Sequence, residues 1–269
     1  MSKNVRNSAI FSTHGKSIGA LLLAACFGIS SVASADETDA KRILKAMSDY
    51  LSAQQAYSFA YDATLEVVTE DDQVLGLASS GTLVVNRPDK VHATRKGGFA
   101  DVDMWFDGTT FTILGKNVNM YTQLAIPGSI DQLVDVLRDK YGRPLPAADL
   151  MLANAYDALM ENVVDVKDLG SGVIGGMECD SLAFRKADVD FQIWIAHGDR
   201  PYPCRYVITS REIAGNPKYS VQVSDWKTGT EAAKDDFTFK NPTNAEKVEL
   251  DQLKGAGDLP DNFSKGESQ

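Results

Sequence analysis

The sequence predicts an α+β fold in which a single antiparallel sheet curves around helices that cover its apolar face. Three observations lead to this prediction. One amphipathic helix is followed by a block of short strands, two further helices and a second block of strands. Several strands alternate apolar and polar side chains, which is typical of a sheet with one buried face. No stretch resembles an interdomain linker, so we expect one domain over residues 36–254 and a mobile tail over residues 255–269.

The first helix is predicted from apolar residues that recur at helical spacing after Thr38, whose side chain can cap the helix. The apolar face consists of Ala40, Ile43, Leu44, Met47 and Leu51. We therefore expect this helix to pack one face against the sheet.

The strand that begins at Tyr57 shows the clearest alternation in the chain. The side chains expected on one face are Phe59, Tyr61, Ala63, Leu65 and Val67, with polar residues between them. Further strands are predicted at residues 74–86, 90–94, 102–106, 110–114 and 118–126, separated by turn residues.

Two helices are predicted between the blocks of strands. Residues 129–141 begin with Ser129 and Gln132, which have the spacing of a capping box. Prolines then break the chain, and residues 147–160 restart a helical pattern. We expect the leucines on the apolar faces of these helices to be buried: Leu133, Leu137 and Leu152. The second block of strands, residues 163–226, includes a strand that places Phe191, Ile193 and Ile195 on one face.

Residues 1–35 have the three zones of a cleaved secretory signal peptide. A basic stretch without acids precedes the apolar run at residues 18–29, and small residues follow, ending in Ala33, Ser34 and Ala35. The apolar run is about a dozen residues, short of the roughly 20 that span a bilayer, so no transmembrane segment is expected in the mature chain. The prediction is a periplasmic protein whose mature chain starts at Asp36.

An alternative maturation is compatible with the same segment. Residues 23–26 end in Cys26 and resemble a lipobox, in which that cysteine would be lipidated and anchor the protein to a membrane. The well-formed site at Ala35 favours soluble release over lipidation. Both routes place the protein outside the cytoplasm.

The mature chain is expected to be strongly acidic. The segment removed holds three basic and no acidic residues, so the formal net charge changes from −10 to −13. Such a surface repels phosphate backbones, which excludes nucleic acid as a favoured partner.

Two cysteines remain after the signal segment, Cys179 and Cys204, and an isolated pair in an oxidising compartment suggests a disulfide. Their positions argue against it, because in a simple meander they flank a middle strand and lie roughly 10 Å apart. A disulfide needs Cα atoms within about 7 Å. The bridge therefore forms only if the strand ends curl past the middle strand, and both outcomes stay open.

The sequence shows no catalytic or metal-binding constellation, so no cofactor is expected. Neither His92 nor His197 has partners at the spacing of a metal site. No nucleophile elbow, phosphate-binding loop or Cys-x-x-Cys motif is present. The aspartates near Trp105, at positions 101, 103 and 107, fit the polar face of a strand and a turn better than acid–base catalysis.

Several strings resemble a family of predicted periplasmic proteins called domain of unknown function 2092. The most specific are residues 175–185 (GGMECDSLAFR) and 189–195 (VDFQIWI), and the similarity covers most of residues 38–249. Where the family often has histidine after Cys-Asp, this chain has Ser181, which weakens a metal or catalytic role there. Cys204 stands where the family looks usually basic, so the resemblance implies no family-wide disulfide.

That family is similar to the LolA/LolB lipoprotein-carrier superfold, an open antiparallel half-barrel closed by helices around a hydrophobic cavity. The resemblance implies this architecture and a hydrophobic ligand. It also implies a final strand at residues 236–239, followed by Asn241 and Pro242.

The favoured function is a non-enzymatic periplasmic binding or carrier protein for a lipid, a lipoprotein acyl chain or another apolar small molecule. Side chains on two strands are expected to line one ligand cavity: Phe59, Tyr61, Leu65, Phe191, Ile193 and Ile195. The alternatives are an envelope protein-interaction or sensing module, and a hydrolase that uses Asp180, His197 or Asp199.

Overall fold

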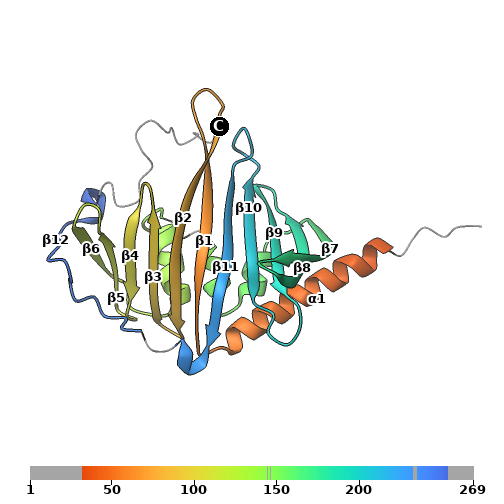
Figure 1. Cartoon of the computed structure of the whole chain (residues 1–269), viewed down its shortest axis with the longest axis horizontal. Helices are drawn as coiled ribbons and strands as arrows, with labels where there is room; N and C mark the ends of the chain where they lie inside the picture. Colours follow the sequence, from red (N-terminus) through yellow and green to blue (C-terminus); the bar gives the residue numbers. More distant parts are fainter. Residues whose placement is uncertain (1–31, 144, 146, 233–234, 254–269) are drawn as a thin grey trace, which may run out of the picture.

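The computed structural model describes residues 32–143, 145, 147–232 and 235–253, and the side chains from residue 36 onward within these ranges (Figure 1). The predicted signal segment up to residue 31, the lipobox cysteine Cys26 and the predicted tail over residues 255–269 lie outside the described residues.

Twelve strands form one open, mostly antiparallel curved sheet in the order β12-β6-β5-β4-β3-β2-β1-β11-β10-β9-β8-β7 (Figure 1). The first block contains β1 (Ala56–Val68), β2 (Val74–Asn86), β3 (Lys90–Gly97), β4 (Asp101–Phe106), β5 (Thr110–Gly115) and β6 (Met120–Ala125). The second contains β7 (Asp165–Ile174), β8 (Met177–Arg185), β9 (Val189–Ala196), β10 (Pro203–Ser210) and β11 (Lys218–Thr228), and the short β12 (Glu246–Lys247) runs parallel to β6. Strands β1 and β11 pair, which joins the two blocks at the centre of the sheet.

Helices α1 (Val32–Ala53), α2 (Ile130–Asp139) and α3 (Ala155–Met160) pack on one face of the sheet, which we call the inner face. Three short 3-10 helices accompany them: η1 (Ala148–Met151), η2 (Gly229–Glu231) and η3 (Leu250–Gln252). In Figure 1 the sheet is in front of α2 and α3, and α1 runs past the lower ends of the strands of the second block.

Two apolar clusters form the core on the inner face. In the first, the predicted face of α1 packs against strands β8–β10; its residues include Ala40, Leu44, Met47, Leu51, Leu182, Phe191 and Ile193. In the second, α2 packs against the first block of strands; its residues include Val85, Phe106, Phe111, Ile130, Leu133 and Leu137. Trp226 packs against both clusters and so connects them.

The capping box predicted for the second helix is confirmed. The Ser129 hydroxyl accepts a hydrogen bond from the backbone N–H of Gln132, whose side chain accepts one from the backbone N–H of Ser129. Leu133 and Leu137 are 1% and 2% exposed, as the apolar periodicity predicted. The sequence therefore fixes both the start of this helix and the face it buries.

The start of the first helix was predicted wrongly. Helix α1 begins at Val32, so Thr38 lies inside the helix and does not cap it. Two of the preceding residues are alanines, the residue with the highest helix propensity, and they allow the helix to extend further toward the N-terminus.

Residues 147–160 do not form one helix, which corrects the prediction. The 3-10 helix η1 ends at Met151, the backbone of Leu152 is extended, and α3 starts after Asn154. The Asn154 side chain accepts a hydrogen bond from the backbone N–H of Asp157 and thereby caps the new helix. Because Leu152 lies at this break, its side chain is half-buried rather than fully buried as expected.

The final strand implied for residues 236–239 is also absent. This segment has no regular secondary structure and packs across the face of the sheet opposite the helices, which we call the outer face. The Phe239 ring lies 5.3 Å from that of Trp105 and 4.8 Å from that of Tyr121, measured between ring centroids. Aromatic packing, and not strand pairing, positions this segment.

Candidate functional site

The candidate site is the inner face of the central strands β2, β1, β11 and β10. Leu65 on β1 lies directly opposite Leu77 on β2 and Tyr219 on β11, and Tyr219 lies opposite Ile208 on β10. We call these four residues together with Tyr61 the central strip, and all five are half-buried. The strip is thus an apolar surface in the middle of the inner face that is partly accessible.

Well-packed core lies beside the central strip and at the other end of the inner face. On the β9 side, Phe191, Ile193 and Ile195 are 2%, 0% and 0% exposed and belong to the cluster that includes α1. Toward the Tyr57 end of β1, Val85 on β2 and Val91 on β3 are 0% and 6% exposed in the cluster that includes α2. The central strip therefore differs from these core residues in accessibility, not in polarity.

The structure places the six predicted cavity residues on the same face but not in the same environment. Phe59, Tyr61 and Leu65 are half-buried along β1, whereas the three residues of β9 are packed within the core. That all six residues line one cavity stays a proposal. Of the six, the three residues of β1 are the partly accessible ones.

Tyr61 lies flat on the sheet because the neighbouring strand has a glycine at the paired position. A Cβ atom on Gly81 would come within 2.7 Å of the Tyr61 ring, so the ring covers this glycine. The Tyr61 hydroxyl donates a hydrogen bond of 2.8 Å to the backbone carbonyl of Thr94 on β3. Burial raises the pKa of Tyr61 to about 12, so its hydroxyl stays protonated at neutral pH.

Arg95 brings a positive charge to the edge of the central strip. It lies opposite Gly81, on the same face as Val91 and Ala93. Its Nε donates a hydrogen bond of 3.4 Å to Ser79 Oγ, and its guanidinium lies 5.0 Å from the centroid of the Phe99 ring. Within the described part of the chain, no carboxylate forms an ion pair with Arg95, whereas Arg185 and Arg211 both pair with Asp190.

The electric field of Arg95 reaches the two tyrosines of the strip. Burial raises the pKa of Tyr219, and the Arg95 charge acts in the opposite direction on both Tyr219 and Tyr61. A cation and two neutral hydroxyl groups thus lie within electrostatic range of one another on the inner face.

Trp226 closes one end of the candidate site with a stack of aromatic rings. Its ring centroid lies 5.2 Å from that of Tyr57, 5.5 Å from that of Phe59 and 4.9 Å from that of Tyr202. The indole Nε1 also donates a hydrogen bond of 3.3 Å to the hydroxyl of Tyr50 on α1. This stack fixes α1 and the loop before β10 to the inner face.

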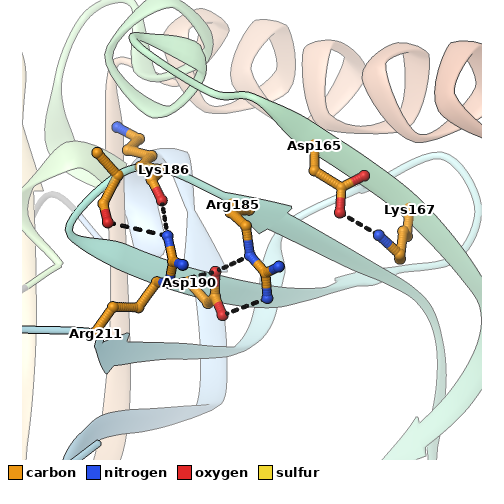
Figure 2. A network of polar contacts seen from close by, with 7 residues as sticks. Asp165, Lys167, Arg185, Lys186, Asp190 and Arg211 are labelled. Atoms are coloured by element: carbon orange, nitrogen blue, oxygen red, sulfur yellow. Dashed lines mark hydrogen bonds and ion pairs between the residues drawn. The ribbon is translucent and has the colours of Figure 1, made fainter.

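Charged groups on the outer face pair with one another (Figure 2). The guanidinium of Arg185 donates hydrogen bonds of 2.8 and 3.0 Å to the two carboxylate oxygens of Asp190, which lowers the pKa of that carboxyl. Arg211 donates to the backbone carbonyls of Lys186 and Ala187 at 2.7 and 3.0 Å. These contacts hold the turn between β8 and β9 against the segment after β10, and we assign them a structural role.

The acid–base candidates have structural partners. His197 Nδ1 lies 3.5 Å from Asp180 Oδ1, but the His197 side chain is 66% exposed and no described serine, threonine or cysteine bonds to it. Lys116 pairs with Asp103 and Asp101 at 2.8 and 3.4 Å. Asp107 accepts hydrogen bonds in its turn, and His92 pairs with Asp235 at 2.6 Å. The last acid–base candidate, Asp199, is exposed to solvent.

The described residues contain neither a metal-binding cluster nor a membrane-spanning helix. No group of three or more His, Cys, Asp or Glu side chains is arranged to hold a metal ion in the described ranges. No helix among these residues combines the length and the apolar character needed to cross a membrane.

The two cysteines lie much closer together than a simple meander predicts. Their Sγ atoms are 2.8 Å apart although β9 separates the strands that carry them. The pairing of β10 with β9 is irregular between Pro203 and Arg205, which places Cys204 in a bulge. Bulges redirect side chains, so the strand end reaches past the middle strand as the disulfide would require.

We propose that Cys179 and Cys204 form a disulfide in the oxidising periplasm, with the disulfide of a thiol–disulfide oxidoreductase accepting the two electrons and two protons. Burial raises the pKa of both thiols, so free thiolate is scarce and a structural bridge is expected rather than a reactive one. Protein prepared from the periplasm should therefore be two hydrogens lighter than its sequence mass and should take up an alkylating reagent only after reduction.

The matched control for this measurement is Cys204→Ser, which leaves Cys179 as a single thiol. Denatured Cys204→Ser should be alkylated once without reductant. Alkylation of both cysteines in the denatured, unreduced original chain would show that no bridge forms.

Comparison with known proteins identifies the family. The family described as "Predicted periplasmic protein (DUF2092)" matches residues 40–251. The chain belongs to the DUF2092 family. This membership confirms the resemblance drawn from residues 175–195 and the periplasmic localisation, and the matched range contains Arg95 and the whole central strip of this DUF2092 protein.

Several solved structures are similar in fold to this DUF2092 chain. The lipoprotein LppX of Mycobacterium tuberculosis is 12% identical with a TM-score of 0.45, and the match covers 73% of this chain and 99% of LppX. The MucA/MucB complex of Pseudomonas aeruginosa is 16% identical with a TM-score of 0.44, covering 75% and 61%. A LolA superfamily protein from Nitrosomonas europaea is 12% identical with a TM-score of 0.32, covering 71% and 93%. No curated protein matches the sequence.

The sequence reasoning missed Arg95, Leu77 and Tyr219 of this DUF2092 protein. A signal for Arg95 was present, because Val91, Ala93 and Arg95 alternate with polar residues and so share a face. An arginine that continues an apolar alternation is expected on the buried face. No comparable signal marks Leu77, whose place in the site depends on pairing with Leu65.

Proposed function

We propose that this protein is a non-enzymatic periplasmic binding or carrier protein for a hydrophobic ligand, which it receives on the central strip. The observation that carries the proposal is the contrast in burial on the inner face. Leu65, Leu77 and Ile208 are half-buried next to inner-face residues of β8 and β9 that are fully buried, among them Leu182, Phe191 and Ile193. Contiguous apolar surface that stays accessible in a folded protein marks a binding site for an apolar partner.

The arrangement of the helices supports this proposal. Helix α1 packs on the second block of strands and α2 on the first, so each covers one side of the inner face. We propose that the sheet acts as a half-barrel that these helices partly close and that the ligand completes the closure over the central strip. Burying apolar surface contributes about 25 cal/mol per Å², so even a short acyl chain would be held.

A binding role also accounts for the polar residues better than catalysis does. Asp101 and Asp103 are paired with a lysine, and exposed His197 has an aspartate neighbour but no nucleophile among the described side chains. A hydrolase needs a nucleophile or an activated water beside its base. The central strip instead offers one cation and two neutral tyrosine hydroxyls.

Substitution of Leu65 tests the proposed function. Leu65→Ser replaces apolar surface at the middle of the strip, and we expect it to weaken binding of the neutral dye N-phenyl-1-naphthylamine about fivefold or more. The measurement is a fluorescence titration, accompanied by thermal unfolding to show that the variant is folded. Leu77→Ser, directly opposite, should have a similar effect.

The matched control is Val84→Ser on β2, because Val84 is half-buried on the outer face, beside His92. Dye affinity should be unchanged in Val84→Ser. Equal losses in the two variants, or no dye binding by the original chain, would contradict the proposal.

A second candidate function is a protein-interaction module, which the edge strand β7 favours. The side chains of Val164, Leu169 and Val173 are 74%, 49% and 71% exposed along or beside this strand. An edge strand with exposed apolar side chains can pair with a strand of another protein. Native mass spectrometry of protein purified from the periplasm separates the two candidates, because a carrier retains a small apolar molecule and an interaction module retains a protein.

A further inference from the structure

We infer that the ligand is a long-chain amphiphile with a single anionic head group of the fatty-acid type, whose head group pairs with Arg95 and whose chain lies along the central strip. This inference rests on the proposed function and adds the chemical class of the ligand. It is carried by a cation that the described residues leave without a counter-ion on an apolar face.

The guanidinium of Arg95 has no neutralising partner among the described residues, and an anionic ligand would supply one. Ser79 gives Arg95 one long hydrogen bond, and Phe99 gives it contact with an aromatic ring, but neither neutralises its charge. A cation held against apolar surface without an opposite charge is unfavourable, and a carboxylate that accepts its hydrogen bonds removes that penalty. Arginine is suited to this role because its planar guanidinium binds a carboxylate through two parallel hydrogen bonds.

The neighbouring hydroxyl groups add donors for the same head group. Tyr219 lies close enough to Arg95 for the charge to act on its hydroxyl, and burial keeps this hydroxyl protonated. Among the described residues no acceptor is hydrogen-bonded to Tyr219, so its O–H is available to a ligand. The Tyr61 hydroxyl already donates to Thr94 and can accept but not donate a further bond.

The apolar part of the ligand would extend from Arg95 along the inner face. Gly81 lies between Arg95 and Tyr61 in the same cross-strand row and carries no side chain that would separate them. The next row on this face, which contains Ser79, Ala63 and Val221, is buried, and the half-buried row of Leu77, Leu65 and Ile208 follows it. One charged end and one apolar path describe an amphiphile with one head group.

The experiment compares two fluorescent probes that differ only in charge: dansyl-labelled undecanoic acid and its methyl ester. The original chain should bind the acid more tightly than the ester. In Arg95→Gln, affinity for the acid should fall about tenfold or more, the range expected for lost charge-assisted hydrogen bonds, while affinity for the ester changes less than about twofold. Arg95→Lys should keep a preference for the acid, because it keeps the charge.

The matched control is Arg205→Gln, which removes the same charge from the outer face, where Arg205 lies 5.5 Å from the Trp194 ring centroid. It should bind both probes like the original chain. If thermal unfolding shows that Arg95→Gln is not folded, Arg95→Met serves for the same comparison, because it keeps an apolar stem over Phe99.

Two results would overturn the inference, and they separate it from the proposed function. Equal affinity of the original chain for acid and ester, or undiminished affinity of Arg95→Gln for the acid, would contradict the anionic head group. The proposed function as a carrier of apolar ligands would still stand. Failure of the original chain to bind either probe would contradict both the inference and the proposed function.

Discussion

Ile193→Asp should lower the free energy of unfolding by about 4 kcal/mol or more, which is a large fraction of the roughly 5–15 kcal/mol that stabilises a typical domain. Ile193 is fully buried, and Leu182 and Tyr206 lie directly opposite it on the neighbouring strands. Helix α1 covers this position through the apolar cluster that includes Leu44. A carboxylate placed there finds no partner charge, and burying an unpaired charge is strongly unfavourable.

The measurement is urea unfolding followed by far-ultraviolet circular dichroism, with Gln192→Asp as the matched control. Gln192 is the preceding residue of the same strand, and its side chain is exposed on the outer face. The control should stay within about 0.5 kcal/mol of the original chain. A folded Ile193→Asp with a similarly small loss would show that β9 faces an accessible space, as the cavity predicted from the sequence requires.

The faces of the individual elements could be predicted from the sequence because each depends on local periodicity. The alternation along β1 and β9 and the helical spacing in α1 each place their apolar residues on the inner face, as observed. The capping box at Ser129 sets the start of α2 for the same reason. Periodicity and capping act within a few residues, so one sequence carries the full signal.

Features that depend on tertiary contacts were not predicted. The sequence predicts one sheet made of two blocks of strands, but not that the pairing of β1 with β11 joins the blocks. The aromatic segment at residues 236–239 has the composition of a strand, yet contacts with Trp105 and Tyr121 keep it on the outer face without strand pairing. Long-range packing of this kind overrides the strand propensity of the segment.

The site was predicted only in part, because the sequence shows on which face a side chain lies but not whether a distant element covers it. Alternation identified Phe59, Tyr61 and Leu65 as residues of the inner face, and these remain accessible. The same rule selected Phe191 and Ile193, but alternation cannot show that α1 covers them. Face is a local property, whereas accessibility is decided by elements distant in the sequence.

Gly81→Ala is the second substitution with a large expected effect, because it acts on the fold and on the site together. An added Cβ atom would lie 1.9 Å from the backbone carbonyl oxygen of Thr94 and 2.7 Å from the Tyr61 ring. The carbonyl belongs to the neighbouring strand β3, so β2 and β3 must separate locally to admit the methyl group. Such overpacking typically lowers the free energy of unfolding by about 2–3 kcal/mol, equivalent to roughly 5–10 °C in Tm for a chain of this size.

The displaced Tyr61 ring should also disturb the central strip, so a folded Gly81→Ala should bind N-phenyl-1-naphthylamine more weakly than the original chain. Gly76→Ala is the matched control on the same strand: its Cβ atom would lie 3.2 Å from the Thr64 Cγ2 methyl group, and this side chain can shift. Calorimetry and dye titration of the two variants then isolate the contribution of position 81. A Gly81→Ala variant as stable as Gly76→Ala, with undiminished dye affinity, would contradict this prediction. It would show that the position of the Tyr61 ring does not depend on a glycine at position 81.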